Sequence, residues 1–236
     1  LNLIINMSNI KKVIKDRKLV LEQMSIVGTD SLPLVILIGS FTGAIAALQA
    51  TNLFEKFNLV GIAMPFIGSS IATVVFTELT PVLTALVIAG RIGGSMAAQL
   101  GTMKVTEQID ALYTLNANPY NFLVIPRVCA CILSLPLLTL TSDILGVFGG
   151  FLVGVSTLEF NPTNYLLNTV KFLELADVVS GLIKAIFFGL IIGVLGTFHG
   201  LNTTVGARGV GISTISAVVW SSISVLAANY ILTEAL

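Results

Sequence analysis

Residues 61–90 read GIAMPFIGSSIATVVFTELTPVLTALVIAG, a run of 30 residues whose single charged side chain is Glu78. About 20 apolar residues suffice for a helix to cross the hydrocarbon layer of a bilayer. The run is therefore long enough for one crossing, and we expect Pro65 and Pro81 to break or kink the helix. The alternative is a re-entrant hairpin, which would raise the number of crossings in the chain from five to six.

Four further apolar stretches accompany this run. They cover residues 32–50, 126–156, 178–198 and 212–233, and segments rich in Asn, Pro and Gly separate them. We therefore predict an all-α integral membrane protein with five transmembrane helices. Residues 1–30 place lysines between apolar positions, which favours an N-terminal amphipathic helix lying on the membrane face.

The composition agrees with a membrane protein. The chain is 55% hydrophobic and 10% charged, whereas soluble domains contain about 25% charged residues. These values exclude a soluble globule and a disordered chain. The formal net charge is zero, so nothing in the composition favours nucleic acid as a partner. Cys129 and Cys131 lie two residues apart in an apolar run and are expected to be buried thiols rather than a disulfide.

The sequence lacks the residues that several enzymatic functions require. His199 is the only histidine, so the sequence offers no support for a histidine-based metal site. An intramembrane serine protease would have to use Ser69 or Ser70 with His199, but the chain contains no G-x-S-x-G segment. It also contains no G-x-x-x-x-G-K-[ST] loop for binding ATP. We assign no catalytic residue to this chain.

The positive charges orient the five-helix arrangement. With the N-terminus inside, nine lysines and arginines fall on the inner side and three, Lys56, Lys171 and Lys184, on the outer side. This distribution follows the positive-inside rule and places the C-terminus outside. The inner cations are Lys11, Lys12, Lys15, Arg17, Lys18, Arg91, Lys104, Arg127 and Arg208.

Glycines recur four residues apart along the predicted spans, which permits close helix packing in lipid. This spacing indicates a tight bundle or a dimer. The pairs are Gly39/Gly43, Gly90/Gly94, Gly146/Gly150, Gly150/Gly154, Gly189/Gly193 and Gly196/Gly200.

Two carboxylates lie inside apolar runs, where a charge is costly and normally faces a cavity or a partner. Glu78 has the hydroxyls of Thr77 and Thr80 close in sequence, and Pro81 frees a backbone carbonyl about one turn earlier. This polar, irregular spot favours a functional role for Glu78. For Asp143 the favoured interpretation is a hydrogen bond to a neighbouring helix.

The longest polar interruption on the inner side runs from Gly90 to Pro119. Within it we expect a short amphipathic helix that Thr106 caps and whose first turn carries Glu107 and Asp110. Val105, Ile109 and Leu112 share its apolar side. The helix is either an ordinary interfacial helix or a docking helix for a soluble partner.

The central part of the chain contains a long block of distinctive sequence. It comprises ELTPVLTAL at 78–86, AGRIG at 89–93 and AAQLGTMKVTEQIDAL at 97–112, followed by Asn118-Pro119, Pro126-Arg127 and SLPLL at 134–138. In order and spacing, residues 25–235 resemble the MlaE/YrbE permease family. The resemblance divides the chain into an interfacial helix at 1–30 and an MlaE-type permease domain at 31–236.

The resemblance implies a membrane subunit of an ABC transporter that moves phospholipid or related lipid between membranes. It further implies a homodimer with ABC ATPase subunits on the cytoplasmic or stromal face and an MCE-type lipid-binding subunit on the other face. The location would be a bacterial inner membrane or a plastid inner envelope. ATP would act through the partner ATPase, and no cofactor is expected on this chain.

From these patterns we expect three groups of site residues. The expected lipid path contains Glu78, Thr77, Thr80, Pro81 and Gln49; the ATPase-coupling group contains Glu107, Gln108, Asp110 and Lys104; and a structural hinge contains Gly90, Arg91 and Gly93.

The chain also departs from the family pattern. Thr77 stands where the family often has an arginine, and Gln99 stands where it usually has an acid. We therefore expect Glu78 to act without an ion-pair partner, and we expect Glu78→Gln to be partly active and Glu78→Leu inactive. The alternative function is a proton-coupled secondary transporter or channel that uses Glu78 and Asp143; an intramembrane enzyme is a third hypothesis.

Overall fold

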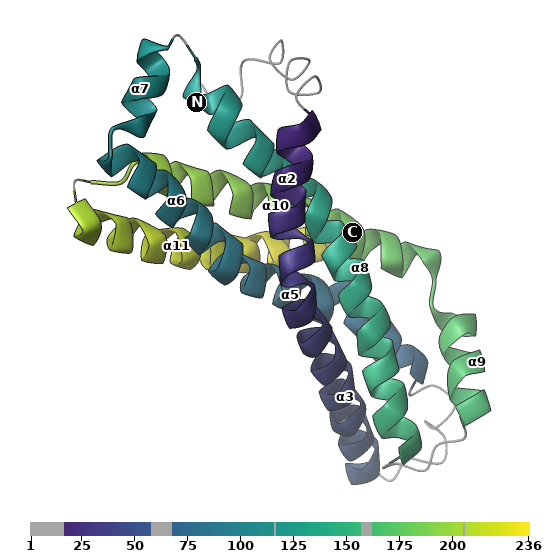
Figure 1. The fold of residues 1–236 in the computed structure, drawn as a ribbon. Helices are drawn as coiled ribbons and strands as arrows, with labels where there is room; N and C mark the ends of the chain where they lie inside the picture. The colour runs from purple at the N-terminus through teal and green to yellow at the C-terminus, as the bar shows by residue number, and fades with distance from the viewer. Residues whose placement is uncertain (1–16, 58–67, 116, 157–161, 205) are drawn as a thin grey trace. The chain divides into compact units, whose positions relative to one another are not determined.

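The computed structural model describes residues 17–57, 68–115, 117–156, 162–204 and 206–236, and within these ranges the chain is helical and contains no strand. Five helical segments of the described residues are long and apolar enough to cross a membrane (Figure 1). These segments confirm the prediction of an all-α membrane protein with five crossings. They are Lys18–Lys56, Gly68–Val105, Tyr120–Ser156, Leu175–Leu201 and Gly206–Ala235.

The first two spans contain several helical segments each. The first consists of α2 (Arg17–Val27), a 3-10 turn (Thr29–Ser31) and α3 (Leu32–Lys56). The second is helical from Gly68 and continues through a π-helical turn (Val75–Leu79), α5 (Thr80–Ile88), a second π-helical turn (Ala89–Gly93) and α6 (Gly94–Val105).

A short loop helix, α7 (Gln108–Thr114), comes next. The remaining elements are a third π-helical turn (Tyr120–Val124), α8 (Ile125–Ser156), α9 (Pro162–Phe172), α10 (Leu175–Leu201) and α11 (Gly206–Ala235).

One boundary and one additional helix differ from the sequence prediction. The second span does not end at Gly90, because the π-helical turn Ala89–Gly93 carries the helix through this polar segment to Val105. α9 was not predicted; its Tyr165 packs edge-to-face on Phe151, with ring centroids 5.7 Å apart. Burial raises the pKa of the Tyr165 phenol to about 12.

Of the N-terminal helix predicted at 1–30, α2 is described; residues 1–16, and also Pro65, lie outside the described residues.

The chain divides into two compact units, and the division falls within α5, α8 and α10. Of the described residues, the first unit comprises those within 17–31, 85–135 and 186–235, and the second comprises those within 32–84 and 136–185. Each of these three helices therefore contributes one segment to each unit.

In the second unit, α3 and α8 lie side by side and touch through glycine (Figure 1). A Cβ atom added to Gly43 would lie 1.7 Å from the carbonyl oxygen of Gly146, and one added to Gly149 would lie 2.1 Å from that of Ser40. Backbone approaches this close require glycine, so the predicted spacing marked a helix contact at Gly43 and Gly146. Gly149 belonged to no predicted pair, whereas Gly90, which did, has nothing within 4 Å of an added Cβ atom.

We expect Gly43→Ala to destabilise the protein strongly, because the methyl group would overlap a backbone carbonyl that no rotamer change can move. Overpacking typically costs about 1–3 kcal/mol. Gly211→Ala in α11 is the matched control, since nothing lies within 4 Å of its added Cβ. Thermal unfolding in detergent, followed by the fluorescence of Trp220, measures the difference; equal midpoints for the two variants would contradict this packing.

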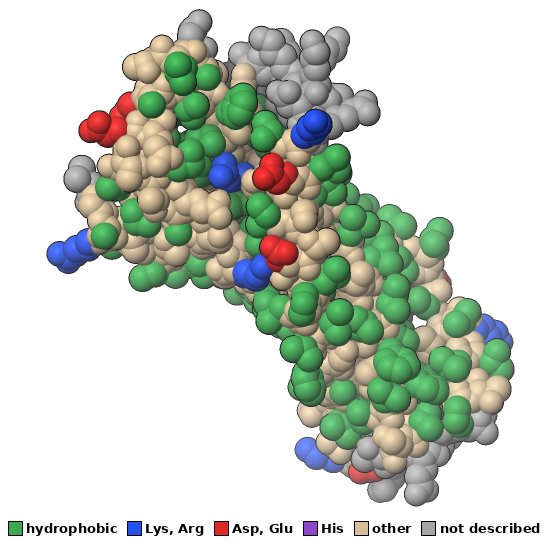
Figure 2. Space-filling view, viewed as in Figure 1, with side chains coloured by type: hydrophobic (Ala, Val, Ile, Leu, Met, Phe, Trp, Pro, Cys, Tyr) green, Lys and Arg blue, Asp and Glu red, His purple; other side chains and the backbone are tan. Residues whose placement is uncertain are grey.

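In the first unit, α6 and α11 lie side by side (Figure 1). The buried positions of α11 recur every four residues and are mostly small: Gly209, Ser213, Ala217, Ser221 and Val225. Large apolar side chains are exposed elsewhere on the same helix, among them Ile215 and Trp220. Figure 2 shows hydrophobic side chains spread over the visible face and few charged ones, as expected for a surface in contact with acyl chains.

Candidate functional site

Glu78 lies in the π-helical turn Val75–Leu79 of the second span. Single π-helical turns within α-helices are frequent at functional sites. Pro81 follows shortly after and has no N–H, so it cannot bond to the carbonyl oxygen of Thr77, four residues earlier. The structure therefore provides the free carbonyl that the sequence predicted beside Glu78.

Lys184 of α10 occupies this spot. Its Nζ donates to the Thr77 carbonyl oxygen at 2.9 Å and to Glu78 Oε1 at 2.5 Å. The Lys184 side chain is 2% exposed, whereas that of Glu78 is 32% exposed. A buried ammonium group thus pairs with a carboxylate that remains open to the surroundings.

This pair corrects the sequence-based expectation. The absence of a neighbouring arginine did not leave Glu78 without a cation, because the cation comes from a helix 106 residues later in the chain. Counting Lys184 among the outer cations was also wrong, since the side chain is buried within a span. The signal in the sequence was Lys184 itself, the one charged residue in the apolar run 178–198.

A second polar contact joins the same two spans. Thr73 Oγ1 donates to Asp177 Oδ2 at 3.3 Å, and the backbone N–H of Glu174 donates to the same oxygen. Asp177 and Lys184 are seven residues apart, so they lie on one face of α10. α10 packs closely here because Gly181 lies between them, where a Cβ atom would be 2.3 Å from the carbonyl oxygen of Phe76. One face of α10 thus presents an acid, a glycine and a cation to the second span.

Asp143 takes part in a separate buried contact. Thr80 Oγ1 hydrogen-bonds Asp143 Oδ1 and also lies 2.9 Å from the Val75 carbonyl oxygen, to which it donates. Thr80 is fully buried and Asp143 is 2% exposed. This contact is the hydrogen bond to a neighbouring helix that the sequence favoured for Asp143.

We expect Thr80→Val to destabilise the protein more than Thr80→Ser does. Valine has nearly the same shape but removes the hydroxyl, and a buried polar group that loses its partner costs about 1–3 kcal/mol. Serine keeps the hydroxyl and loses one methyl group. Denaturation midpoints in one detergent compare the two; a valine variant as stable as the wild type would show that this hydrogen bond does not stabilise the fold.

The other predicted lipid-path and hinge residues have different surroundings. Gln49 is exposed on α3, and no hydrogen bond connects it to Glu78 or Lys184. Gly90 is exposed and Gly93 buried, and both belong to the π-helical turn Ala89–Gly93. Arg91 donates to Ser31 Oγ, and its Nη2 lies 4.0 Å from Asp30 Oδ2.

The predicted loop helix exists as α7, but Thr106 does not cap it. Thr106 ends α6, and its hydroxyl donates to the Thr102 carbonyl oxygen. Glu107 precedes α7 with a left-handed backbone (φ 58°) and makes no side-chain capping bond. Asp110 does lie in the first turn, as predicted, and Glu107, Gln108 and Asp110 are exposed.

Contacts in the first unit tie α7 to the spans. Ile109 is buried in a cluster with Leu100 and Leu123, against which Leu112 also packs. Lys104 Nζ donates to the carbonyl oxygen of Leu201, at the end of α10, at 2.6 Å.

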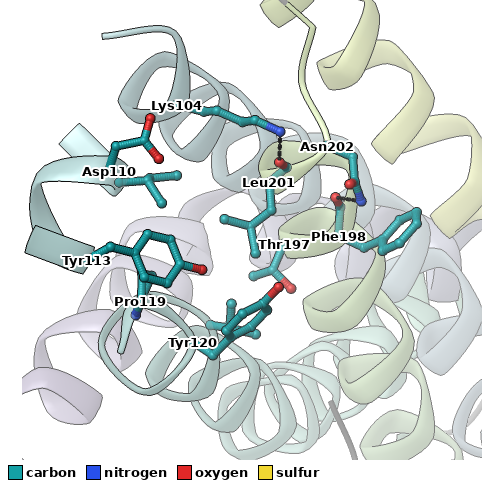
Figure 3. Close-up of a pocket in the computed structure, with 11 residues that line it drawn as sticks. Lys104, Asp110, Tyr113, Pro119, Tyr120, Thr197, Phe198, Leu201 and Asn202 are labelled. Atoms are coloured by element: carbon teal, nitrogen blue, oxygen red, sulfur yellow. Dashed lines mark hydrogen bonds between the residues drawn. The ribbon is translucent and has the colours of Figure 1, made fainter. Parts of the chain in front are cut away.

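Beside these contacts lies a cavity of about 390 Å³ between α7 and the end of α10. Lys104, Asp110, Tyr113, Tyr120 and Asn202 are among the residues that line it (Figure 3). α7 is therefore anchored on one side and exposed on the other.

Five apolar spans, an ion pair within them and an anchored, exposed loop helix characterise a polytopic membrane protein. The chain belongs to the MlaE permease family, because residues 20–235 match the family model for Permease MlaE. It is an ABC transporter permease, which is an integral membrane subunit of a transport system.

Relatives come from bacteria and plants. The chain is 48% identical to a probable ABC transporter permease protein of Rickettsia typhi over 222 residues, which cover 92% of this chain and 83% of the relative. It is 42% identical to such a protein of a Synechocystis strain over 92% of this chain and 81% of the relative.

The chain is also 37% identical to the chloroplastic protein TRIGALACTOSYLDIACYLGLYCEROL 1 of Arabidopsis thaliana, over 91% of this chain and 60% of that protein. The spans and these relatives place the chain in a bacterial inner membrane or a plastid envelope.

Proposed function

We propose that this permease moves a phospholipid or related lipid between membranes, driven by ATP hydrolysis in a separate ABC ATPase. The MlaE family membership and the lipid in the name of the Arabidopsis relative support lipid as the substrate class. The Glu78–Lys184 pair is the single observation of the structure that supports the proposal best. It places two opposite charges in contact between two membrane-spanning helices.

The chemistry of the pair suits an amphiphile. A lipid headgroup needs polar partners within the membrane, while its acyl chains need an apolar surface. The Glu78 carboxylate is one third exposed, so it is the part of the pair that a headgroup or its water reaches first. Lys184 stays buried beneath it, and its Nζ holds the Glu78 carboxyl group in place by direct contact with Oε1.

The ATPase would dock on the exposed side of α7 through Glu107, Gln108 and Asp110. Movement of α7 would reach the spans through Ile109, packed on α6 and the turn Tyr120–Val124, and through Lys104, bonded to the end of α10. ATP would be bound by the ATPase, with no cofactor on this chain.

The assembly would contain two copies of this chain, because a five-span protomer is small for a lipid-sized path, and an MCE-type lipid-binding subunit on the face away from the ATPase. Native mass spectrometry in nanodiscs tests the stoichiometry: we expect two permease chains per complex, and monomers that still support transport would contradict the homodimer.

A purification of the tagged chain from its own membranes tests the proposed function. We expect an ABC ATPase to copurify and its ATP hydrolysis to increase on addition of phospholipid. If hydrolysis is absent and a proton gradient alone drives substrate movement, the proton-coupled function that uses Glu78 and Asp143 is the correct one.

A further inference from the structure

α6 carries a polar stripe along one face within a membrane span. Ser95, Gln99, Thr102 and Thr106 are exposed, and their spacing of four, three and four residues puts them on one side of the helix. The opposite side is buried and includes Met96, Ala97 and Leu100. The hydroxyls of Thr102 and Thr106 donate to carbonyl oxygens one turn earlier, whereas Ser95 and Gln99 are joined to each other by a hydrogen bond of 3.3 Å. The part of the stripe around Ser95 and Gln99 is therefore the part best able to accept a polar partner.

Arg127 lies beneath this stripe. Its side chain comes from the first turn of α8, and the residue is 9% exposed. Nη1 donates to the Leu123 carbonyl oxygen at 2.8 Å, and Nη2 donates to Gln99 Oε1 at 3.4 Å. Nε is buried and has no hydrogen-bond partner.

No carboxylate pairs with this guanidinium in the part of the chain that the structure describes. The ion pairs found there are Arg91–Asp30 and Lys184–Glu78. A buried charge with no counter-charge is strongly unfavourable, and arginine does not lose its proton in proteins. The buried guanidinium group of Arg127 therefore lacks a negatively charged partner among the described residues.

Gln99 is the group through which an anion would reach Arg127. The side chain is exposed and held by two long hydrogen bonds, 3.3 Å to Ser95 Oγ and 3.4 Å from Arg127. A small rotation of this side chain would uncover the guanidinium. Gln99 also lies seven residues before the end of the polar stripe at Thr106, which is about 10 Å along a helix.

We propose that Arg127, with Gln99 as a displaceable cover, binds the phosphate group of an anionic lipid headgroup. A planar guanidinium offers the paired donors that suit phosphate oxygens. The polar stripe of α6 accommodates the rest of the headgroup, and the apolar surface around it accepts the acyl chains. The site belongs to the first unit and uses none of the residues around Glu78. It concerns lipid binding by the resting protein and does not depend on the proposed transport cycle.

Gln99→Glu is the most direct test, because it supplies the missing counter-charge without removing Arg127. We expect it to lower at least tenfold the amount of phosphatidylglycerol retained per chain after detergent extraction, measured by native mass spectrometry. We expect its thermal unfolding midpoint to rise, since the new carboxylate pairs with a buried cation. Gln23→Glu, the same chemical change in α2, serves as the control and should retain lipid as the wild type does.

Two further arms complete the test. Arg127→Gln should also lose phosphatidylglycerol, and the wild type should retain phosphatidylglycerol in preference to diacylglycerol, which has no phosphate. Unchanged phosphatidylglycerol in Gln99→Glu would overturn the proposal. So would equal retention of diacylglycerol, or stabilisation of the wild type by inorganic phosphate but not by phosphatidylglycerol at constant ionic strength. A change of oligomeric state without a change of retained lipid would show instead that the stripe contacts a second copy.

Discussion

Glu78→Gln is expected to destabilise the protein more than Lys184→Met does, although both variants break the same ion pair. Removing Glu78 leaves the ammonium group of Lys184, which is 2% exposed, buried without its counter-charge. Breaking a buried pair in this way costs about 3–5 kcal/mol. Removing Lys184 leaves a carboxylate that is 32% exposed and can be hydrated, and methionine fills the space of the lysine stem.

The double replacement separates charge pairing from packing. Glu78→Gln combined with Lys184→Met leaves no charge at this contact, so we expect it to be more stable than Glu78→Gln alone. Unfolding midpoints of the four proteins in one detergent form the double-mutant cycle. Additive effects, with the double variant the least stable, would show that the two side chains do not interact as the structure indicates.

Lipid transport by the two single variants and the double variant is expected to follow a different pattern from their stability. If the pair contacts the headgroup, all three variants lose most lipid transport, including the double variant with restored stability. The partial activity expected for Glu78→Gln from the sequence alone depended on a carboxylate without a partner, and the structure removes that premise. Normal transport by the stable double variant would show that the pair serves folding and does not contact the lipid.

Charge reversal at Glu107 is expected to abolish binding of the ATPase while the permease stays folded. Glu107 is exposed at the start of α7, and its side chain makes no capping hydrogen bond. Replacing its carboxylate should therefore leave the fold unchanged. We expect Glu107→Lys to reduce the ATPase recovered with the tagged permease at least tenfold. Glu55→Lys, a charge reversal near the exposed end of α3, is the control and should recover the ATPase normally.

The backbone at Glu107 allows a second variant that distinguishes charge from shape. Its φ of 58° is a region that glycine adopts without strain, so Glu107→Gly relieves the backbone and deletes the carboxylate. We expect this variant to be at least as stable as the wild type and still to bind the ATPase weakly. Full recovery of the ATPase with either variant would show that Glu107 is not part of the docking surface.

Hydropathy was sufficient to predict the five spans, because apolar runs such as 61–90 have few other stable environments. Proline chemistry was sufficient to predict the free carbonyl beside Glu78. Hydropathy did not predict where the second span ends. Gly90 and Arg91 are residues typical of a loop, but the structure accommodates them in a π-helical turn that continues the helix.

Long-range pairing was the main gap in the sequence analysis. Lys184 looked like one of the outer cations because periodicity and charge counts describe each span alone and contain no information on which helices touch. The cap of α7 failed for a local reason: a left-handed residue between α6 and α7 lets Thr106 bond backwards to Thr102 instead of forwards. The first error concerns a contact between distant helices, and the second concerns the backbone conformation of a single residue.

The most direct test of lipid transport is the transfer of a labelled phospholipid by proteoliposomes that contain this permease and its copurified ATPase. We expect transfer that requires hydrolysable ATP, stops when the ATPase is inactivated, and falls to background in Glu107→Lys. Transfer that proceeds without ATP, or a complete and hydrolysing complex that moves no lipid, would contradict the account.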